Sequence, residues 1–139
     1  MTIPYAFTLD LPRPLPQAVE ALRGALASEQ MGIVSEVDVQ ATLKTKLGLD
    51  SPPRRLLGVC GPQVAHALMT AEPDIAAMLP CGGAATETEA GRTRIVLQDP
   101  RVIAALSDNV EVRAACERAH AALRRVLDRM AAGALAAGP

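Results

Sequence analysis

The sequence predicts an α+β fold, in which a five-stranded mixed or antiparallel sheet carries helices packed mainly on one face. Segments with the two-residue alternation of strands are interleaved with segments of helical periodicity. The last two strand segments are joined as a hairpin, so the strands cannot all be linked by parallel crossovers. The chain closes with a long helical segment that has one narrow apolar stripe. Together these observations favour an α+β sandwich.

The first strand and the first helix are indicated by an alternating pattern followed by prolines. Tyr5, Phe7 and Leu9 alternate with smaller or polar residues, which is the pattern of a half-buried strand. The prolines after this strand end it and open a helix near Leu15, which carries an apolar stripe at helical spacing. Gly32 is the expected stop at the C-terminal end of this helix.

The second strand, residues 33–39, runs into a short helix over residues 39–47. Asp38 is a suitable N-cap, and the glycine after the helix ends it. This stretch holds the only two lysines of the chain, Lys44 and Lys46, whereas the other twelve basic residues are arginines. Lysine is a compact ammonium that arginine does not replace. Lys44, at the margin of the apolar face of the helix, is therefore a candidate for binding an anion or a partner.

The third and fourth strands each end in a cysteine. Residues 55–60 form an apolar run that is typical of a central strand, and the Gly-Pro pair after Cys60 opens a helix over residues 62–70. Residues 75–81 are expected to form the fourth strand, which ends at Cys81. The proline before that cysteine indicates an edge position or a bulge.

The chain is completed by a hairpin and two helices. Residues 82–91 are expected to be a loose connection to the fifth strand, residues 94–98. An Asp-Pro pair then starts a short helix. Asp108 and Glu111 make a capping-box pattern before the last helix. The apolar stripe of that helix recurs at steps of four and three and consists of Val112, Cys116, Ala119, Leu123, Val126 and Met130.

The length of 139 residues fits a single domain, expected over residues 1–130. Residues 131–139 have neither periodicity nor charge and are expected to fray. The chain has one Tyr, one Phe and no Trp, so its core must be built from aliphatic side chains. A core divided among small side chains favours burial of further surface between subunits, and we expect a homodimer.

Composition also argues against several functional classes. A net charge of −1 and the scarcity of aromatic residues argue against a nucleic-acid surface. No apolar run approaches the ~20 residues of a membrane span, and no secretory signal opens the chain. The three cysteines do not form a disulfide framework. A cytoplasmic protein with reduced thiols is the simplest interpretation.

Four motifs occur in order along the chain: DVQATLKTKLG at 38–48, RRLLGVCGP at 54–62, AEPDIAAMLPC at 71–81 and a strand ending in QDP at 98–100. In these the chain resembles the bacterial and archaeal family catalogued as domain of unknown function 302, over roughly residues 3–130. The resemblance implies a compact α+β domain that associates as a dimer and has no established activity. Gly61 and residues 82–91 depart from the family pattern, which typically has asparagine and β-branched residues there.

Cys60 is the strongest candidate for a reactive thiol, because the positive end of the helix after it stabilises a thiolate and lowers the pKa. The competing interpretation is that Cys60 is a small buried residue. If the third and fourth strands are neighbours, Cys81 lies close to Cys60, and the two either share a site or pack independently. Lys44 is the candidate cation for this site if the short helix folds over the strand ends.

The remaining chemistry-bearing residues do not assemble a site in the sequence. Cys116 and His120 have the spacing of helical metal ligands, but two ligands do not make a metal site, and core packing is favoured. His66 lies near Cys60 in sequence, and a Cys–His pair can activate a thiolate, but this histidine leans toward the surface. No nucleotide-binding, hydrolase or metalloprotease motif occurs. We therefore assign no catalytic residue, metal or cofactor.

The leading interpretation is a homodimeric binding or accessory domain without established catalysis, with its functional surface at Lys44, Cys60 and Cys81 and a small ligand as a further possible partner. The alternative is a thiol-based protein that carries sulfur or senses redox state through Cys60 with Cys81. A purely structural subunit is a third interpretation. Thiol reactivity distinguishes them, since only the thiol-based protein needs a cysteine with a low pKa.

Overall fold

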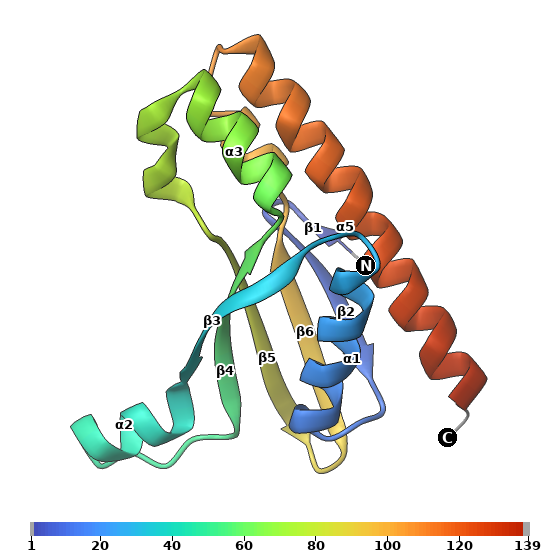
Figure 1. Cartoon of the computed structure of the whole chain (residues 1–139). Helices are drawn as coiled ribbons and strands as arrows, with labels where there is room; N and C mark the ends of the chain where they lie inside the picture. The colour runs from blue at the N-terminus through green and yellow to red at the C-terminus, as the bar shows by residue number, and fades with distance from the viewer. Residues whose placement is uncertain (1, 138–139) are drawn as a thin grey trace.

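The computed structural model describes residues 2–137, and within them the chain builds a six-stranded antiparallel sheet with the strand order β1-β2-β6-β5-β4-β3 (Figure 1). The strands are β1 (Thr2–Ile3), β2 (Ala6–Leu11), β3 (Gly32–Asp38), β4 (Arg54–Cys60), β5 (Cys81–Glu89) and β6 (Arg92–Gln98). The last four strands form a meander, and β2 joins the sheet by pairing with β6. The predicted α+β class is confirmed, with the two-residue β1 added at one edge.

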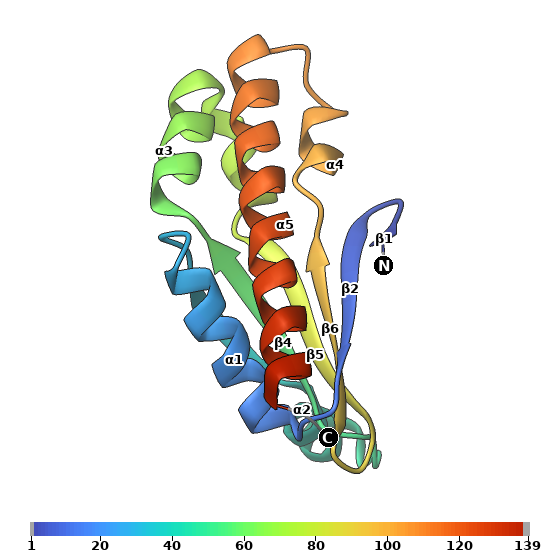
Figure 2. The same ribbon diagram turned by 90° about the vertical axis from the view of Figure 1, so that its right-hand side faces the viewer.

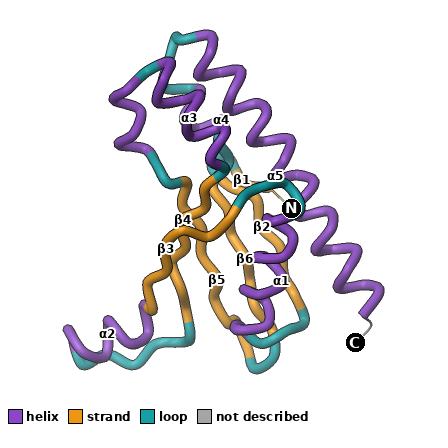
Figure 3. The backbone as a smooth tube through the Cα atoms, in the orientation of Figure 1, coloured by secondary structure: helices purple, strands orange, loops and turns teal. Residues whose placement is uncertain are grey.

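The helices of the described chain are α1 (Leu15–Ala27), α2 (Val39–Leu47), α3 (Pro62–Ala71), the 3-10 helix η1 (Pro73–Met78), α4 (Arg101–Ala104) and α5 (Val110–Ala137). α1 and α5 lie side by side over one face of the sheet (Figures 1 and 2). α3 and α4 pack on the first half of α5, beyond one end of the strands. α2 stands off the opposite end, at the β3 edge (Figure 3). Among residues 2–137 no helix covers the other face.

The main core lies between the sheet and the α1–α5 pair. Its large buried members are Phe7, Leu11, Leu15, Val19, Leu22, Leu26, Leu57, Val59, Ile95, Leu97, Leu123 and Val126. A second cluster joins α3, η1, α4 and α5 through Leu68, Ile75, Ile103, Val112 and Cys116. Each buried aliphatic side chain of this kind contributes about 1.5–3 kcal/mol to folding before entropy is counted. The aliphatic core predicted from composition is thus present in two connected parts.

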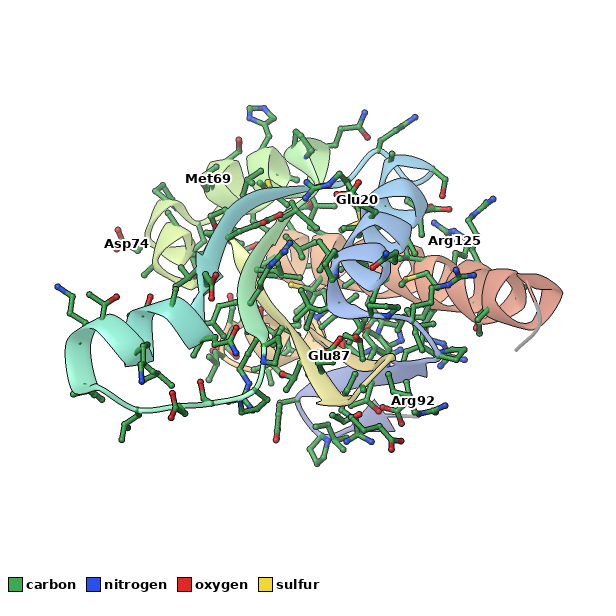
Figure 4. All side chains as sticks on the ribbon, turned by 90° about the horizontal axis from the view of Figure 1, so that it is seen from below. Glu20, Met69, Asp74, Glu87, Arg92 and Arg125 are labelled. Carbon is green, nitrogen blue, oxygen red and sulfur yellow. The ribbon has the colours of Figure 1, made fainter. Side chains whose placement is uncertain are left out.

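The start of α1 is fixed from across the sheet. Its N-cap residue, Pro14, offers no side-chain acceptor. Instead the backbone N–H of Leu15 donates to Oε1 of Glu87 on β5 at 3.2 Å. Figure 4 shows Glu87 close to the first turn of α1. Because a carboxylate is favourable at the positive end of a helix, this hydrogen bond ties α1 to β5.

The short helix α2 forms as the sequence predicts. The side chain of Asp38 accepts from the backbone N–H of Ala41 at 3.0 Å, and Gly48 ends the helix with a φ of 66°. A left-handed residue at this position is tolerated best by glycine. The N-cap and the C-terminal stop are both confirmed.

The fourth strand was predicted in the wrong place. Residues 75–81 were expected to be a strand, but most of them belong to η1, and the strand β5 begins at Cys81 and runs through the expected loose connection. The PDIAAM segment lacks β-branched and aromatic residues apart from Ile75, so its strand propensity is weak. β5 forms because β4 and β6 pair with it on both sides, which is a long-range effect.

Three segment ends also differ from expectation. α1 ends at Ala27, and Gly32 begins β3 rather than stopping the helix. The cap of α5 is Asn109, whose Oδ1 accepts from the backbone N–H of Glu111 at 2.9 Å, instead of the Asp108 capping box. α5 is helical through Ala137, beyond the expected domain limit at residue 130, and residues 138–139 lie outside the described residues. Alanine is the strongest helix former, which explains the extension.

No helix within residues 2–137 is long and apolar enough to cross a membrane.

Candidate functional site

Cys60 and Cys81 lie together at the end of the sheet nearest α3. Cys81 is opposite Val59 in the register of β4 and β5, and Cys60 is the next residue along β4. Both cysteines line one cavity of about 30 Å³, which we call the cysteine pocket. The other lining residues are Met31, Val59, Gly61, Val64, Ala65, Leu68, Leu79, Pro80, Pro100, Ile103, Ala119 and Leu123. The structure therefore brings the two predicted cysteines to one place.

The pocket exists because β4 turns directly into α3. Gly61 separates the strand from Pro62, which opens the helix. A Cβ added at Gly61 would approach Cγ of Met31 to 3.3 Å, so glycine lets the methionine lie against this turn. Met31 in turn closes one side of the pocket with a side chain that adapts its shape easily.

The walls of the cysteine pocket are apolar, and the Cys81 thiol in it is neutral. Burial, with smaller contributions from the nearby Cys116 and Cys60, raises the pKa of the Cys81 thiol to about 11. Burial also raises the pKa of Cys116. Since the thiolate is the nucleophile and the metal ligand, Cys81 is unsuited to either role at neutral pH. The pocket offers van der Waals contact to a small apolar group.

Lys44 does not belong to this pocket. Asp38, which precedes α2, is opposite Arg55 in the register of β3 and β4, whereas Cys60 is at the other end of β4. A strand of seven residues places these ends about 20 Å apart. Lys44 Nζ instead pairs with Asp50 Oδ1 at 3.0 Å in an exposed ion pair. The cation expected to support a Cys60 thiolate is therefore not supplied by Lys44.

The reasoning that singled out Lys44 was wrong about α2 itself. Leu43 and Leu47 were expected to fix a buried face, but α2 has no buried residue and Leu47 is 64% exposed. α2 follows the edge strand β3, where few other residues of the chain lie close enough to cover it. Its exposure follows from this position in the sheet, which local sequence does not reveal.

Cys116 and His120 have separate structural roles. Cys116 is fully buried in the second core cluster, as predicted. His120 Nδ1 is 2.9 Å from Asp99 Oδ1, and its ring lies 5.1 Å from the ring of Phe7. Asp99 also accepts from the backbone N–H of Arg101 at 3.0 Å, so it joins α4 to α5. Within residues 2–137 no group of three or more metal-ligating side chains forms a metal site.

His66 and Met69 lie on the outer side of α3. His66 is exposed and does not line the cysteine pocket, so it is not placed to activate Cys60. Met69 is 42% exposed (Figure 4). α3 packs on α5 through Leu68, which leaves this side of the helix toward solvent.

The feature that sequence reasoning missed is the pair of exposed apolar side chains on the sheet face opposite α1 and α5. Simple alternation would put Val37 on the same face as Ile33, but the register shifts between Ile33 and Ser35, and this bulge turns Val37 to the other side. Val37 pairs with Leu56, and both side chains are 48% exposed. The apolar run of β4 was a possible signal, because a strand apolar on both faces needs cover on both.

Comparison with known proteins supports the fold. A crystal structure of an uncharacterized conserved DUF302 protein from Bacillus stearothermophilus superposes with a TM-score of 0.81 and 26% sequence identity, covering 92% of this chain and 99% of that chain. No curated protein gives a significant match. The family model described as "Domain of unknown function DUF302" matches residues 7–130. Since this match spans most of the sequence, the chain is a member of the DUF302 family.

Proposed function

We propose that the protein is a self-associating binding module without catalysis of its own, which holds a small apolar group in the cysteine pocket. The observation that carries this proposal is that Cys60 and Cys81, from neighbouring strands, line one apolar cavity in which the Cys81 thiol is neutral. Its apolar walls come from β4, α3, α4 and α5, so a bound group would touch both core clusters.

The size of the pocket limits what it takes. A volume of about 30 Å³ has room for roughly two water-sized groups, whereas pockets for drug-sized ligands or cofactors are about 300–1,000 Å³. A methyl group, a short alkyl chain or the tip of an apolar side chain fits this volume. Met31 and Leu79 border the pocket and are only partly buried, so their movement is the simplest way to admit such a group.

The sulfur-carrier or redox-sensing alternative is less well supported. It needs a cysteine thiolate at neutral pH, and burial holds the pKa of Cys81 at about 11. With that pKa only about one Cys81 in 10⁴ carries a thiolate at pH 7. The cation proposed to favour the Cys60 thiolate lies at the opposite end of β4.

Xenon is a suitable probe, since this apolar atom enters small apolar cavities in proteins. Methyl NMR of the folded protein under xenon pressure should show saturable shifts at Met31, Leu68 and Leu79. The variant Ala65→Leu fills the pocket from α3 and should remove these shifts, while Ala77→Leu, at an exposed position of η1, should keep them. Absence of saturable shifts in the parent protein, or their persistence in Ala65→Leu, would overturn the pocket assignment.

A further inference from the structure

The face of the sheet opposite α1 and α5 presents three transverse rows of side chains, which we call the open face. The middle row is apolar and runs through directly paired residues on four strands: Val37, Leu56, Ala84 and Val96. Val37 and Leu56 remain 48% exposed. Adjacent exposed apolar side chains on a helix-free sheet face indicate an interaction surface.

The second row of the open face is charged. It runs through the directly paired residues Arg54, Thr86, Arg94 and Asp10, on β4, β5, β6 and β2. Arg94 Nε donates to Asp10 Oδ1 at 2.9 Å. Arg54 Nε donates to Thr86 Oγ1 at 3.0 Å, and within residues 2–137 Arg54 has no carboxylate partner. From β4 to β2 the side chains of this row are therefore positive, neutral, positive and negative.

The third row is built from small residues. Gly58 on β4 pairs with Gly82 on β5, and both lie on the open face by alternation. A shallow hollow beside them is lined by Tyr5, Ala6, Gly82, Gly83, Ala84, Val96 and Gln98. Glycines in a strand often mark a place where another backbone approaches closely. The space at Gly58 is filled by Ser35 and Pro80 of the same chain, so the part of this row that is open to a partner is the hollow beside Gly82.

We propose that the open face binds the open face of a second copy of this chain, with the two-fold axis parallel to the strands and between β5 and β6. This inference rests on the self-association in the proposed function and specifies its surface. Two sheets packed face to face keep their strands within about 30° of each other, so each row meets its own copy in reversed strand order. Arg54 then lies opposite the partner's Asp10, and Asp10 opposite the partner's Arg54.

This self-complementarity favours a second copy over an unrelated partner. In the proposed dimer, Asp10 of each protomer lies opposite Arg54 of the other. Two contacts between opposite charges result, one on each side of the axis, and no two carboxylates meet. The same reversal puts Ala84 opposite Val96 of the partner subunit at the centre, and Leu56 opposite the partner's Thr8. α2 projects from the β3 edge away from α1 and α5, and so flanks the open face (Figures 1 and 4).

The available area is of the right order for a dimer. Five strands spaced about 4.8 Å apart, with about 20 Å of length each, give roughly 500 Å² of projected area per protomer. Side-chain relief and the flanking α2 raise the accessible area toward the ~800 Å² per partner of a standard interface. The open face is thus larger and more continuous than the surfaces that form weak crystal contacts.

Charge reversal tests the proposed register. Arg54→Asp places two carboxylates opposite each other at both ends of the charged row and leaves the Asp10–Arg94 pair intact. We expect at least a tenfold rise of the dimer dissociation constant, measured by sedimentation equilibrium at low salt. Combining it with Asp10→Arg should recover most of the loss. Arg125→Asp, on the helix side of the molecule, is the matched control and should leave the dissociation constant unchanged (Figure 4).

Leu56→Asp is the second test and does not depend on the charged row. Because Leu56 lies in the middle apolar row and is half-exposed, its replacement should leave the fold intact by circular dichroism and give monomers. A dimer unaffected by Leu56→Asp and by Arg54→Asp would overturn this inference and leave the proposed self-association standing. A parent protein that is monomeric at 100 µM would overturn both, while the xenon experiment judges the pocket separately.

Discussion

At the scale of single residues, Cys81 shows how its surroundings decide what a side chain can do. The sequence places Cys81 at the end of a predicted strand and makes it a possible partner of Cys60 in a shared thiol site. In the structure Cys81 is surrounded by apolar walls, and burial raises its pKa. The thiol therefore behaves as a small apolar group.

The raised pKa of Cys81 predicts a loss of stability at alkaline pH. The folded protein holds this proton up to about pH 11, whereas the thiol ordinarily releases it at 9.0, so the unfolded state binds fewer protons between these values. The free energy of unfolding should therefore fall by about 1–2 kcal/mol as pH rises from 8.5 toward 11. Urea titrations of the parent and of Cys81→Ala check this. An equal decline in both would show that other groups cause it.

At the scale of elements, the strands β4 and β5 depend on a pair of glycines with different surroundings. A Cβ at Gly58 would collide with Oγ of Ser35 and approach Cγ of Pro80 to 2.8 Å. A Cβ at Gly82, directly opposite on β5, meets no atom within 4 Å. Gly58 thus allows the bulged edge strand β3 and the start of β5 to close over β4.

Gly58 and Gly82 allow a stability prediction in which one glycine serves as the control for the other. Gly58→Ala should lower the free energy of unfolding by about 1–3 kcal/mol, because the proline ring and the serine must move. Gly82→Ala should be neutral or stabilise by about 0.5–1 kcal/mol, since alanine restricts the unfolded chain more than glycine does. Chemical denaturation of both variants measures the difference. Equal effects on the two variants would contradict the packing described here.

The elements that sequence predicts well carry their signals locally. Asp38 and Gly48 define α2 by a cap and a left-handed stop, so its limits were predicted correctly. β5 could not be found this way, because a segment rich in glycine and alanine becomes a strand only through its neighbours β4 and β6. The same holds for the candidate site. Cys60 and Cys81 meet because Cys60 ends β4 and Cys81 begins the antiparallel β5, whereas Lys44 is distant because β3, which leads into α2, ends beside the start of β4.

At the scale of the whole molecule, the sheet carries a layer of helices on one face, and within residues 2–137 no helix covers its other face. The aliphatic core between the sheet and the α1–α5 pair is complete, but Val37 and Leu56 point to the side without helices. We propose that association with a second copy covers these side chains.

Light scattering provides the direct measurement of assembly. We expect twice the chain mass of 14.5 kDa at micromolar concentration, because the open face is apolar at its centre and self-complementary in charge. High salt should weaken the association only partly, since the central row is uncharged. A constant mass of one chain across the concentration range would refute the dimer.

The pairing of β2 with β6 has a consequence for synthesis of the chain. Strands β3 to β6 form a meander, so each can pair with the strand before it as the chain leaves the ribosome. β2 is synthesised before all four, but it can pair with β6 only after β6 has emerged. The first turn of α1 likewise waits for Glu87, which follows Leu15 by 72 residues. The N-terminal segment is therefore expected to consolidate last, although it is translated first, and the nascent protein carries β2 without its β6 partner through most of its elongation.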